Sequence, residues 1–272
     1  MLRVFVRVTL VSVILLLVVP SVNAGLDEGL VFYLTFDNVK DQTINDESGN
    51  GLDAEIVENA EVVKGKYGDA IHITDRGGDC VNIPAQEKLK VVGEITMTLW
   101  VYYQRTWRGQ RMGWIDKDCH TAGWDICYGI ASADNGSGPT AILLLGSRDK
   151  QGKVKRHDFI SPHEMDEKKW HHVAGSYDGE TMKIYIDGKV IGEEKKKFDF
   201  VGNNDSDVRI GCLKDKPHVT FVNGSIDEAA VWRRALSDDE IKQAMLGNFL
   251  AVSPSDKVTT TWADTKMRAI AP

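Results

Sequence analysis

Aromatic and arginine side chains gather in one short part of the chain, where they could bind a sugar. The group consists of Tyr103, Arg105, Trp107 and Arg111. Ligand pockets combine apolar or aromatic walls with a few polar groups; such a wall fits the apolar face of a sugar ring, and arginine donates hydrogen bonds to its hydroxyl groups. Trp107 is the best exposed candidate because arginines flank it. The alternative is that the aromatic residues pack in the core, as Trp and Tyr often do.

The first 24 residues have the composition of an export signal. Arg3 and Arg7 give a basic start, residues 8–20 are almost entirely apolar, and small residues precede Gly25. The apolar run is shorter than the ~20 residues that a membrane-spanning helix needs, which favours cleavage over an uncleaved anchor. The sequence therefore predicts a signal peptide over residues 1–24 and a mature chain that is secreted to the extracellular space or the periplasm.

The chain is acidic, with a formal net charge of −7 at pH 7. Its one basic run, residues 195–197, directly follows two glutamates. An acidic chain without basic clusters argues against binding to nucleic acid or to anionic membrane surfaces. We therefore expect no nucleic-acid partner, and no membrane insertion after the signal is removed.

Four cysteines are present, which in an exported chain favours two disulfides. Cys119 and Cys127 flank Gly123 symmetrically, so a hairpin turning at Gly123 would place them opposite each other. Opposed residues of an antiparallel pair lie ~4.5–5.5 Å apart at Cα, which is within disulfide reach. Cys80 and Cys212 would then pair by default. The spacings do not match a zinc site, and four buried free thiols remain the other alternative.

An alternation of strand and turn dominates the chain after the signal. In the clearest example, Met182, Ile184 and Ile186 share one face, and Asp-Gly pairs at 178–179 and 187–188 suit tight turns because glycine accepts positive φ. The expected strands are residues 30–36, 70–74, 80–84, 95–102, 114–117, 126–130, 141–147, 156–160, 170–177, 182–186, 189–193, 208–211 and 225–232. Many short strands between turns are typical of a β-sandwich.

One helix is expected near the C-terminus. Ser237 and Glu240 have the spacing of a capping box, and the apolar residues that follow share one helical face. The predicted helix is ~9 residues long and covers an edge of the sandwich. Because periodicity is lost after residue 250, we expect one domain over residues 25–250 and a C-terminal tail over residues 251–272.

Four separated segments resemble the LamG-like jelly-roll family, in the concanavalin A-like lectin/glucanase superfamily. They are residues 30–37 with the turn at 46–51, residues 95–101, the double hairpin 170–188, and residues 223–232 with 234–237. With the expected helix, the resemblance implies an all-β fold: a two-sheet antiparallel jelly-roll sandwich with one short C-terminal helix. It also implies a non-catalytic binding module whose partner is a glycan or an extracellular protein. The alternative is a glycoside hydrolase or polysaccharide lyase, since one fold hosts several functions.

The resemblance further implies a structural calcium ion that joins the first and last strands. The residues that match its ligands are Asp37, Asp46, Asn50 and Asp227. Calcium takes about six to eight oxygen ligands, which aspartates and turn carbonyls could supply. The alternative is that Asp37 and Asp46 cap turns and that Asp227 accepts a hydrogen bond from a nearby amide.

No catalytic residues are predicted. Hydrolases of the superfamily place acids at i, i+2 and i+4 on one face of a strand. Glu164 and Asp166 fit the first two positions, but Lys168 occupies the third. Glu167 cannot replace it, because successive side chains of a strand point to opposite faces. We expect this segment to be a solvated connection.

Overall fold

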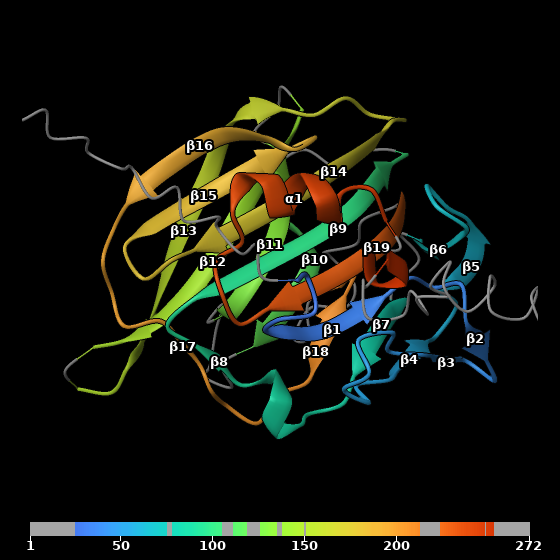
Figure 1. Ribbon diagram of the computed structural model, residues 1–272, viewed down its shortest axis with the longest axis horizontal. Helices are drawn as coiled ribbons and strands as arrows, with labels where there is room; N and C mark the ends of the chain where they lie inside the picture. The colour runs from blue at the N-terminus through green and yellow to red at the C-terminus, as the bar shows by residue number, and fades with distance from the viewer. Residues whose placement is uncertain are drawn as a thin grey trace, which may run out of the picture.

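Two large antiparallel sheets lie face to face, and a small two-stranded sheet accompanies them (Figure 1). The computed structural model describes residues 25–74, 78–104, 111–118, 126–134, 138–149, 151–212, 224–247 and 249–252. Its architecture confirms the predicted all-β jelly-roll sandwich. The predicted signal peptide lies outside the described residues, as do residues 253–272 of the predicted tail. Within the ranges given above, no helix is long and apolar enough to cross a membrane.

The first large sheet, which we call sheet A, has eight strands. Seven of them follow one another across the sheet, and β1 (Leu30–Leu34) pairs separately with β19. In spatial order the seven are β16 (Lys189–Lys195), β15 (Thr181–Ile186), β14 (Trp170–Tyr177), β9 (Ile95–Tyr103), β19 (Gly224–Trp232), β6 (Asp69–Ile73) and β5 (Glu61–Lys64).

The second large sheet, sheet B, has nine strands. In spatial order they are β13 (Val154–Glu164), β12 (Pro139–Arg148), β11 (Ile126–Asp134), β10 (Arg111–Asp118), β18 (Val208–Ile210), β7 (Cys80–Ile83), β4 (Ala54–Val57), β3 (Thr43–Ile44) and β2 (Val39–Lys40). The small sheet pairs β17 (Val201–Gly202) with β8 (Val91–Val92), and η1 (Glu87–Leu89) is a short 3-10 helix.

The main core lies between the two sheets because side chains alternate along each strand. In β9, Met97, Leu99, Val101 and Tyr103 face the core and are fully buried. Tyr102, between two of these residues, is half-buried and lies on the outer face of sheet A. The period of two that the sequence shows therefore decides which aromatic rings a ligand could reach.

Part of the outer face of sheet A is covered by the C-terminal helix, α1 (Asp238–Ala244), which Figure 1 shows in front of this sheet. Both hydrogen bonds of the predicted capping box are present at its start. The helix has seven residues, slightly fewer than expected, and a 3-10 helix, η2 (Phe249–Val252), follows it. Ile241 and Trp232 belong to a second apolar cluster that packs between α1 and the sheet.

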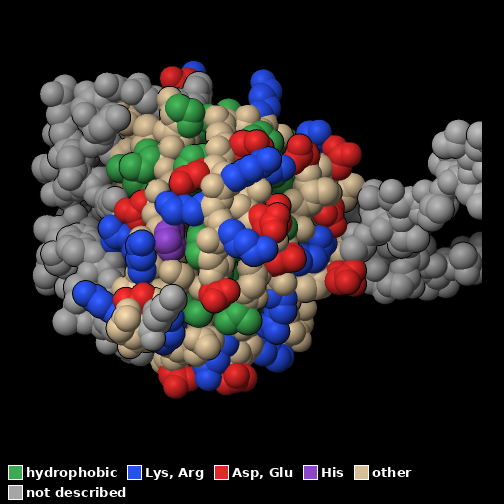
Figure 2. All heavy atoms as spheres, turned by 90° about the vertical axis from the view of Figure 1, so that its left-hand side faces the viewer, with side chains coloured by type: hydrophobic (Ala, Val, Ile, Leu, Met, Phe, Trp, Pro, Cys, Tyr) green, Lys and Arg blue, Asp and Glu red, His purple; other side chains and the backbone are tan. Residues whose placement is uncertain are grey.

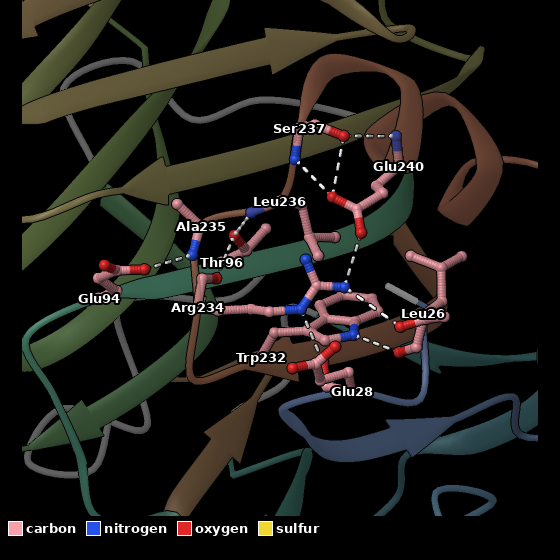
Figure 3. A network of polar contacts seen from close by, with 11 residues as sticks. Leu26, Glu28, Glu94, Thr96, Trp232, Arg234, Ala235, Leu236, Ser237 and Glu240 are labelled. Atoms are coloured by element: carbon pink, nitrogen blue, oxygen red, sulfur yellow. Dashed lines mark hydrogen bonds and ion pairs between the residues drawn. The ribbon is translucent and has the colours of Figure 1, made fainter. Parts of the chain in front are cut away.

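A polar network joins the first described residues to the region around α1 (Figure 3). Trp232 Nε1 donates to Leu26 O at 2.7 Å, and Arg234 Nε donates to Glu28 O at 2.8 Å. Arg234 also forms an ion pair with Glu240 at 2.8 Å. Burial opposes ionisation of Glu240, but hydrogen bonds from Arg234 and the capping serine outweigh it and hold the pKa of Glu240 below its usual value. The network thereby ties both ends of the described domain together.

The structure joins Cys80 and Cys212, one of the two predicted disulfide pairs. The Cα atoms lie 5.5 Å apart, and both residues are buried. Cys80 begins β7 and Cys212 follows β18, and these two strands are hydrogen-bonded neighbours in sheet B. Cys127 is also disulfide-bonded. Its predicted partner, Cys119, lies outside the described residues.

Candidate functional site

A cavity of about 280 Å³ opens on the outer face of sheet A, and we refer to it as the hollow. Strands β5, β6, β9, β14 and β19 supply its walls, so it draws on segments far apart in the sequence. Its lining residues are Val63, Lys64, His72, Tyr102, Gln104, Trp170 and Ser225. A concave site that mixes aromatic walls with a few polar groups is typical of a small-molecule binding site.

The register of sheet A aligns four of these side chains in one row. Trp170 is the partner of Tyr102, Tyr102 is the partner of Ser225, and Ser225 is the partner of His72. Directly opposed residues of neighbouring strands point to the same face. The row therefore runs across β14, β9, β19 and β6, perpendicular to the strands, and presents its side chains together.

Two aromatic rings form one end of the row. The centroids of Tyr102 and Trp170 lie 5.6 Å apart, and their planes are inclined by 50°. Both residues are half-buried, so each ring keeps part of its surface accessible. Apolar CH groups of a ligand could pack against these rings.

Polar groups form the other end of the row. His72 Nδ1 lies 3.2 Å from Ser225 Oγ, and the exposed Lys64 pairs with Asp69 at 3.1 Å. Gln104 adds an exposed amide at the rim. The hollow thus offers hydroxyl, imidazole, amide and ammonium groups to a ligand, and none of the described residues that line it is a carboxylate.

The structure describes only some residues of the aromatic and arginine site predicted from the sequence. Arg105 and Trp107 lie outside the described residues, and only the backbone of Arg111, at the start of β10, is described. The prediction for Tyr103 is wrong, because its side chain is fully buried in the core. Its ring centroid lies 5.8 Å from that of Trp114. Side-chain alternation puts Tyr102 at the hollow instead, one position from the predicted residue.

A third outward-facing aromatic residue of sheet A, Trp100, does not reach the hollow. Lys66 Nζ lies 4.4 Å from its ring centroid, and Trp100 Nε1 donates to Met245 O at 3.1 Å. Only 6% of Trp100 is exposed. The alternation around Trp100 and Tyr102 was a sequence signal for outward aromatic rings, but only the fold shows that one is covered and the other accessible.

Two of the four predicted calcium ligands, Asp37 and Asp227, contact the same turn, residues 65–69, which joins β5 to β6. Asp37 Oδ1 accepts a hydrogen bond from Asp69 N at 2.6 Å. Asp227 Oδ2 accepts one from Tyr67 N at 2.9 Å. The segment that follows the first strand, and the last strand itself, therefore direct carboxylates to one short turn.

At this turn both carboxylates accept backbone amide hydrogen bonds, which is the alternative expected for Asp227. A Cβ atom on Gly68 would lie 1.9 Å from Asp37 Oδ1, and one on Gly65 would lie 2.6 Å from Asp227 Oδ2, so glycine permits both carboxylates to approach the backbone. Burial raises the pKa of Asp227 to about 8. Hydrogen bonds from backbone amides lower this pKa, whereas the negative charge of Glu228 raises it further. A cation nearby would favour the ionised form.

Asp46 and Asn50, the other two predicted ligands, organise the turn that follows β3. The Asp46 carboxylate accepts hydrogen bonds from Tyr33 N, Ser48 N, Ser48 Oγ and Leu52 N, at 2.7–3.0 Å. Asn50 Nδ2 donates to two carbonyls of β1 at 2.9 and 3.0 Å. In the described part of the chain, no group of three or more His, Cys, Asp or Glu side chains could hold a metal ion. Turn carbonyls would have to complete a site built on Asp37 and Asp227.

The acidic segment at the end of β13 leads into a turn. Asp166 forms an exposed ion pair with Lys169 at 2.7 Å. The side chain of Glu164 lies outside the described part of the structure. Lys168 has a φ of 60°, so the chain turns here and does not continue as a strand.

Comparisons with solved structures find the same fold at low sequence identity. Domain 4 of an extracellular arabinanase from Geobacillus stearothermophilus, in complex with arabinotriose, aligns at a TM-score of 0.61 and 19% identity, covering 79% of this chain and 97% of that one. The binding domain of Paraclostridial Mosquitocidal Protein 1 aligns at a TM-score of 0.60 and 17% identity, and the alignment covers 81% of this chain and 52% of that one. The botulinum neurotoxin serotype D ligand-binding domain, in complex with N-acetylneuraminic acid, aligns at a TM-score of 0.59 and 15% identity. That alignment covers 82% of this chain and 52% of the toxin domain.

The chain thus spans about half the length of the two toxin domains and nearly all of the arabinanase domain. No curated protein matches it significantly. A family profile described as the concanavalin A-like lectin/glucanases superfamily matches residues 75–242, more than half of the chain. The two large antiparallel sheets of this chain agree with that match. The chain belongs to the concanavalin A-like lectin/glucanases superfamily.

Proposed function

We propose that this chain is a secreted, non-catalytic module that binds carbohydrate through the hollow. The observation that carries the proposal is the row from Trp170 to His72, which presents two aromatic rings, a hydroxyl group and an imidazole to one cavity. An aromatic wall with a few polar groups suits a sugar, which has both apolar faces and hydroxyl groups. Two of the similar folds are known with a sugar bound, which supports this ligand class.

The rival function is glycoside hydrolysis or polysaccharide cleavage. Glycosidases need two carboxyl groups about 5–9.5 Å apart across the scissile bond. Among the residues that the structure describes, none that lines the hollow is a carboxylate. Binding without hydrolysis is therefore the function that this cavity favours.

An extracellular protein partner is the second alternative. Figure 2 shows one side of the molecule, on which charged side chains of both signs are interspersed with small groups of hydrophobic ones. The most exposed large hydrophobic residues in the described ranges are Leu246 and Val92, at 65% and 54% exposure. Scattered apolar residues of this kind are normal for a surface and do not mark a large docking patch. The hollow therefore carries the stronger functional signal.

Secretion rests on independent observations. The buried Cys80–Cys212 disulfide suits an oxidising compartment, where such bonds form and persist. The predicted signal over residues 1–24 would deliver the chain there. Both features support a module that meets glycans outside the cytosol.

Replacing Trp170 with alanine should abolish or strongly weaken carbohydrate binding. The change removes the larger of the two rings at the hollow. We expect Kd to rise at least about fivefold, because an aromatic contact is worth about 1 kcal/mol or more and about 1.4 kcal/mol is tenfold. The measurement is a glycan array with the mature chain, followed by calorimetric titration of each glycan that binds.

Trp107→Ala is the matched control, because it tests the aromatic and arginine site predicted from the sequence. Binding that survives Trp107→Ala and is lost in Trp170→Ala supports the hollow. The reverse result would move the site to that aromatic and arginine group. Binding unaffected by either change, or no binding to any glycan, would contradict the proposal and favour a protein partner.

We also propose that Asp37 and Asp227 hold a structural calcium ion together with carbonyls of the 65–69 turn. Calcium added at about a hundred times its Kd should stabilise the fold by about 2.7 kcal/mol, which corresponds to a rise in Tm of about 5–10 °C for a domain of this size. EDTA should reverse the rise. Thermal unfolding with and without calcium, together with elemental analysis, measures the effect.

Two variants separate calcium binding from ordinary hydrogen bonding. Asp227→Asn should remove the response to calcium, whereas Asp46→Asn should keep it, although it weakens the turn after β3. Without a calcium site, the wild type would itself show no response to calcium, and Asp227→Asn would lower stability only because its amide cannot accept from both Tyr67 N and Glu228 N. That outcome, with no calcium found by elemental analysis, would refute this proposal.

A further inference from the structure

The shape of the hollow indicates which kind of carbohydrate it takes. We infer that it binds an internal segment of a single, soluble polysaccharide chain, which lies across the strands from Trp170 toward His72. The inference rests on the proposed function and adds the length, course and physical state of the ligand. Three features of the row carry it: its span, its open ends and the inclination of its two rings.

The row is too long for a single sugar ring. From Trp170 on β14 to His72 on β6 there are three steps between neighbouring strands. At ~4.8 Å a step, the span at the backbone is about 14 Å. One pyranose ring cannot contact both ends of that span. A ligand that uses the aromatic end and the polar end together must contain several sugar units.

Both ends of the row allow a chain to continue. At one end, β15 pairs with β14 from Val173 onward, so no described strand pairs with β14 beside Trp170. At the other end, β5 is the last strand of sheet A, and Glu61, the partner of His72, is exposed. A site closed at one end would select the terminus of a glycan. A row open at both ends among the described strands suits an internal segment.

The two rings do not form a flat platform. Their planes are inclined by 50° at a centroid distance of 5.6 Å. Sugar units on the surface of a crystalline polysaccharide lie in one plane, and they would need coplanar rings to stack on both. Successive units of a free chain are rotated relative to each other, so they can meet Trp170 and Tyr102 in turn. The polar groups of His72 and Ser225 would then contact the next units along the chain.

The test is the dependence of affinity on ligand length. Probes are the arabino-, xylo-, laminari-, manno- and malto-oligosaccharides from one to six units, titrated by calorimetry, with crystalline cellulose and crystalline chitin in pull-down assays. We expect Kd to fall at least about tenfold between one unit and the length that spans the row, about three or four units, and then to level off. We expect no retention on either crystalline solid.

His72→Ala should shorten the length at which affinity levels off, because it removes the far end of the row. Trp170→Ala should weaken binding at every length. Circular dichroism and Tm establish that both variants fold. A monosaccharide that binds as tightly as the longer oligomers, or Trp170-dependent retention on a crystalline solid, would overturn the inference and leave the proposed function standing. Failure of all soluble and crystalline probes, or binding insensitive to Trp170, would count against both.

Discussion

Replacing Cys80 or Cys212 with alanine should lower the free energy of unfolding by up to about 5 kcal/mol, as the chain-entropy model gives for a closed loop of this length. The two cysteines are 132 residues apart in the sequence, so the cross-link removes much of the freedom of the unfolded chain. In the folded state the bond only joins strands that are already hydrogen-bonded neighbours. For a domain of this size the loss corresponds to a fall in Tm of about 10–20 °C.

Comparison of Cys80→Ala, Cys212→Ala and the double variant separates the cross-link from packing. Either single change breaks the bond, so the three variants should lose nearly the same stability in urea titrations followed by tryptophan fluorescence. If packing of the two buried sulfur atoms were the main contribution, the single losses would be smaller and would add in the double variant. Additive losses of about 1 kcal/mol each would contradict the prediction.

The sequence predicted the long strands and the helix because each carries its own local signal. The outward and inward residues of β9 alternate without interruption, and Ser237 and Glu240 specify the start of α1 by themselves. The strands β2, β3, β4 and β5 were not expected. Two of them have only two residues, and β5 is mostly exposed, so no hydrophobic period marks them. Their pairing with distant strands, which the local sequence does not encode, determines that they are strands.

The hollow could not be predicted because it depends on register. Trp170, Tyr102, Ser225 and His72 come from four strands, and a shift of one residue in any pairing would turn that side chain toward the core. The prediction of Tyr103 shows the consequence. The predicted residue lies at the correct end of β9, but its neighbour Tyr102 faces the hollow. Composition identifies aromatic-rich segments, whereas register decides which ring is accessible.

The predicted calcium ligands show a similar limit. Asp37 and Asp227 reach the 65–69 turn, whereas Asp46 accepts four hydrogen bonds elsewhere. Asp37 and Asp46 lie near turns and Asp227 lies in β19, yet all three accept backbone N–H hydrogen bonds. The sequence gives no means to tell which backbone segment each carboxylate reaches. The difference lies in the tertiary contacts of each side chain.

Acidification from pH 6.5 toward pH 3 should destabilise the fold through His172, by up to about 4 kcal/mol. His172 is 1% exposed, and its ring lies 5.5 Å from that of Trp100. Its Nδ1 is buried and has no hydrogen-bond partner in the described part of the chain, so a proton there would lack an acceptor. Burial lowers the pKa of His172 to about 3, and the nearby Asp187 carboxylate does not offset it. An unfolded histidine has a pKa of about 6.5.

The sign follows from proton binding. Between pH 6.5 and 3 the unfolded chain holds a proton on His172 that the folded chain does not, so stability is complete above pH 6.5 and decreases as pH falls. The slope from this one group is about 1.4 kcal/mol per pH unit.

His172→Phe should remove that part of the slope, while His72→Gln, on the same sheet but at the hollow, should retain it. Urea titrations at intervals of half a pH unit measure both slopes. Asp227, whose pKa is raised to about 8, holds a proton in the folded chain over this range and contributes a slope of opposite sign, so the decisive quantity is the difference between the slopes of wild type and His172→Phe. The low pKa of Glu240 adds acid sensitivity near and below its unfolded value of about 4.3, so the decisive range is pH 6.5 to 5. Equal slopes for wild type and His172→Phe in that range would show that the buried imidazole can accept a proton without loss of stability, which its unpartnered position beside Trp100 argues against.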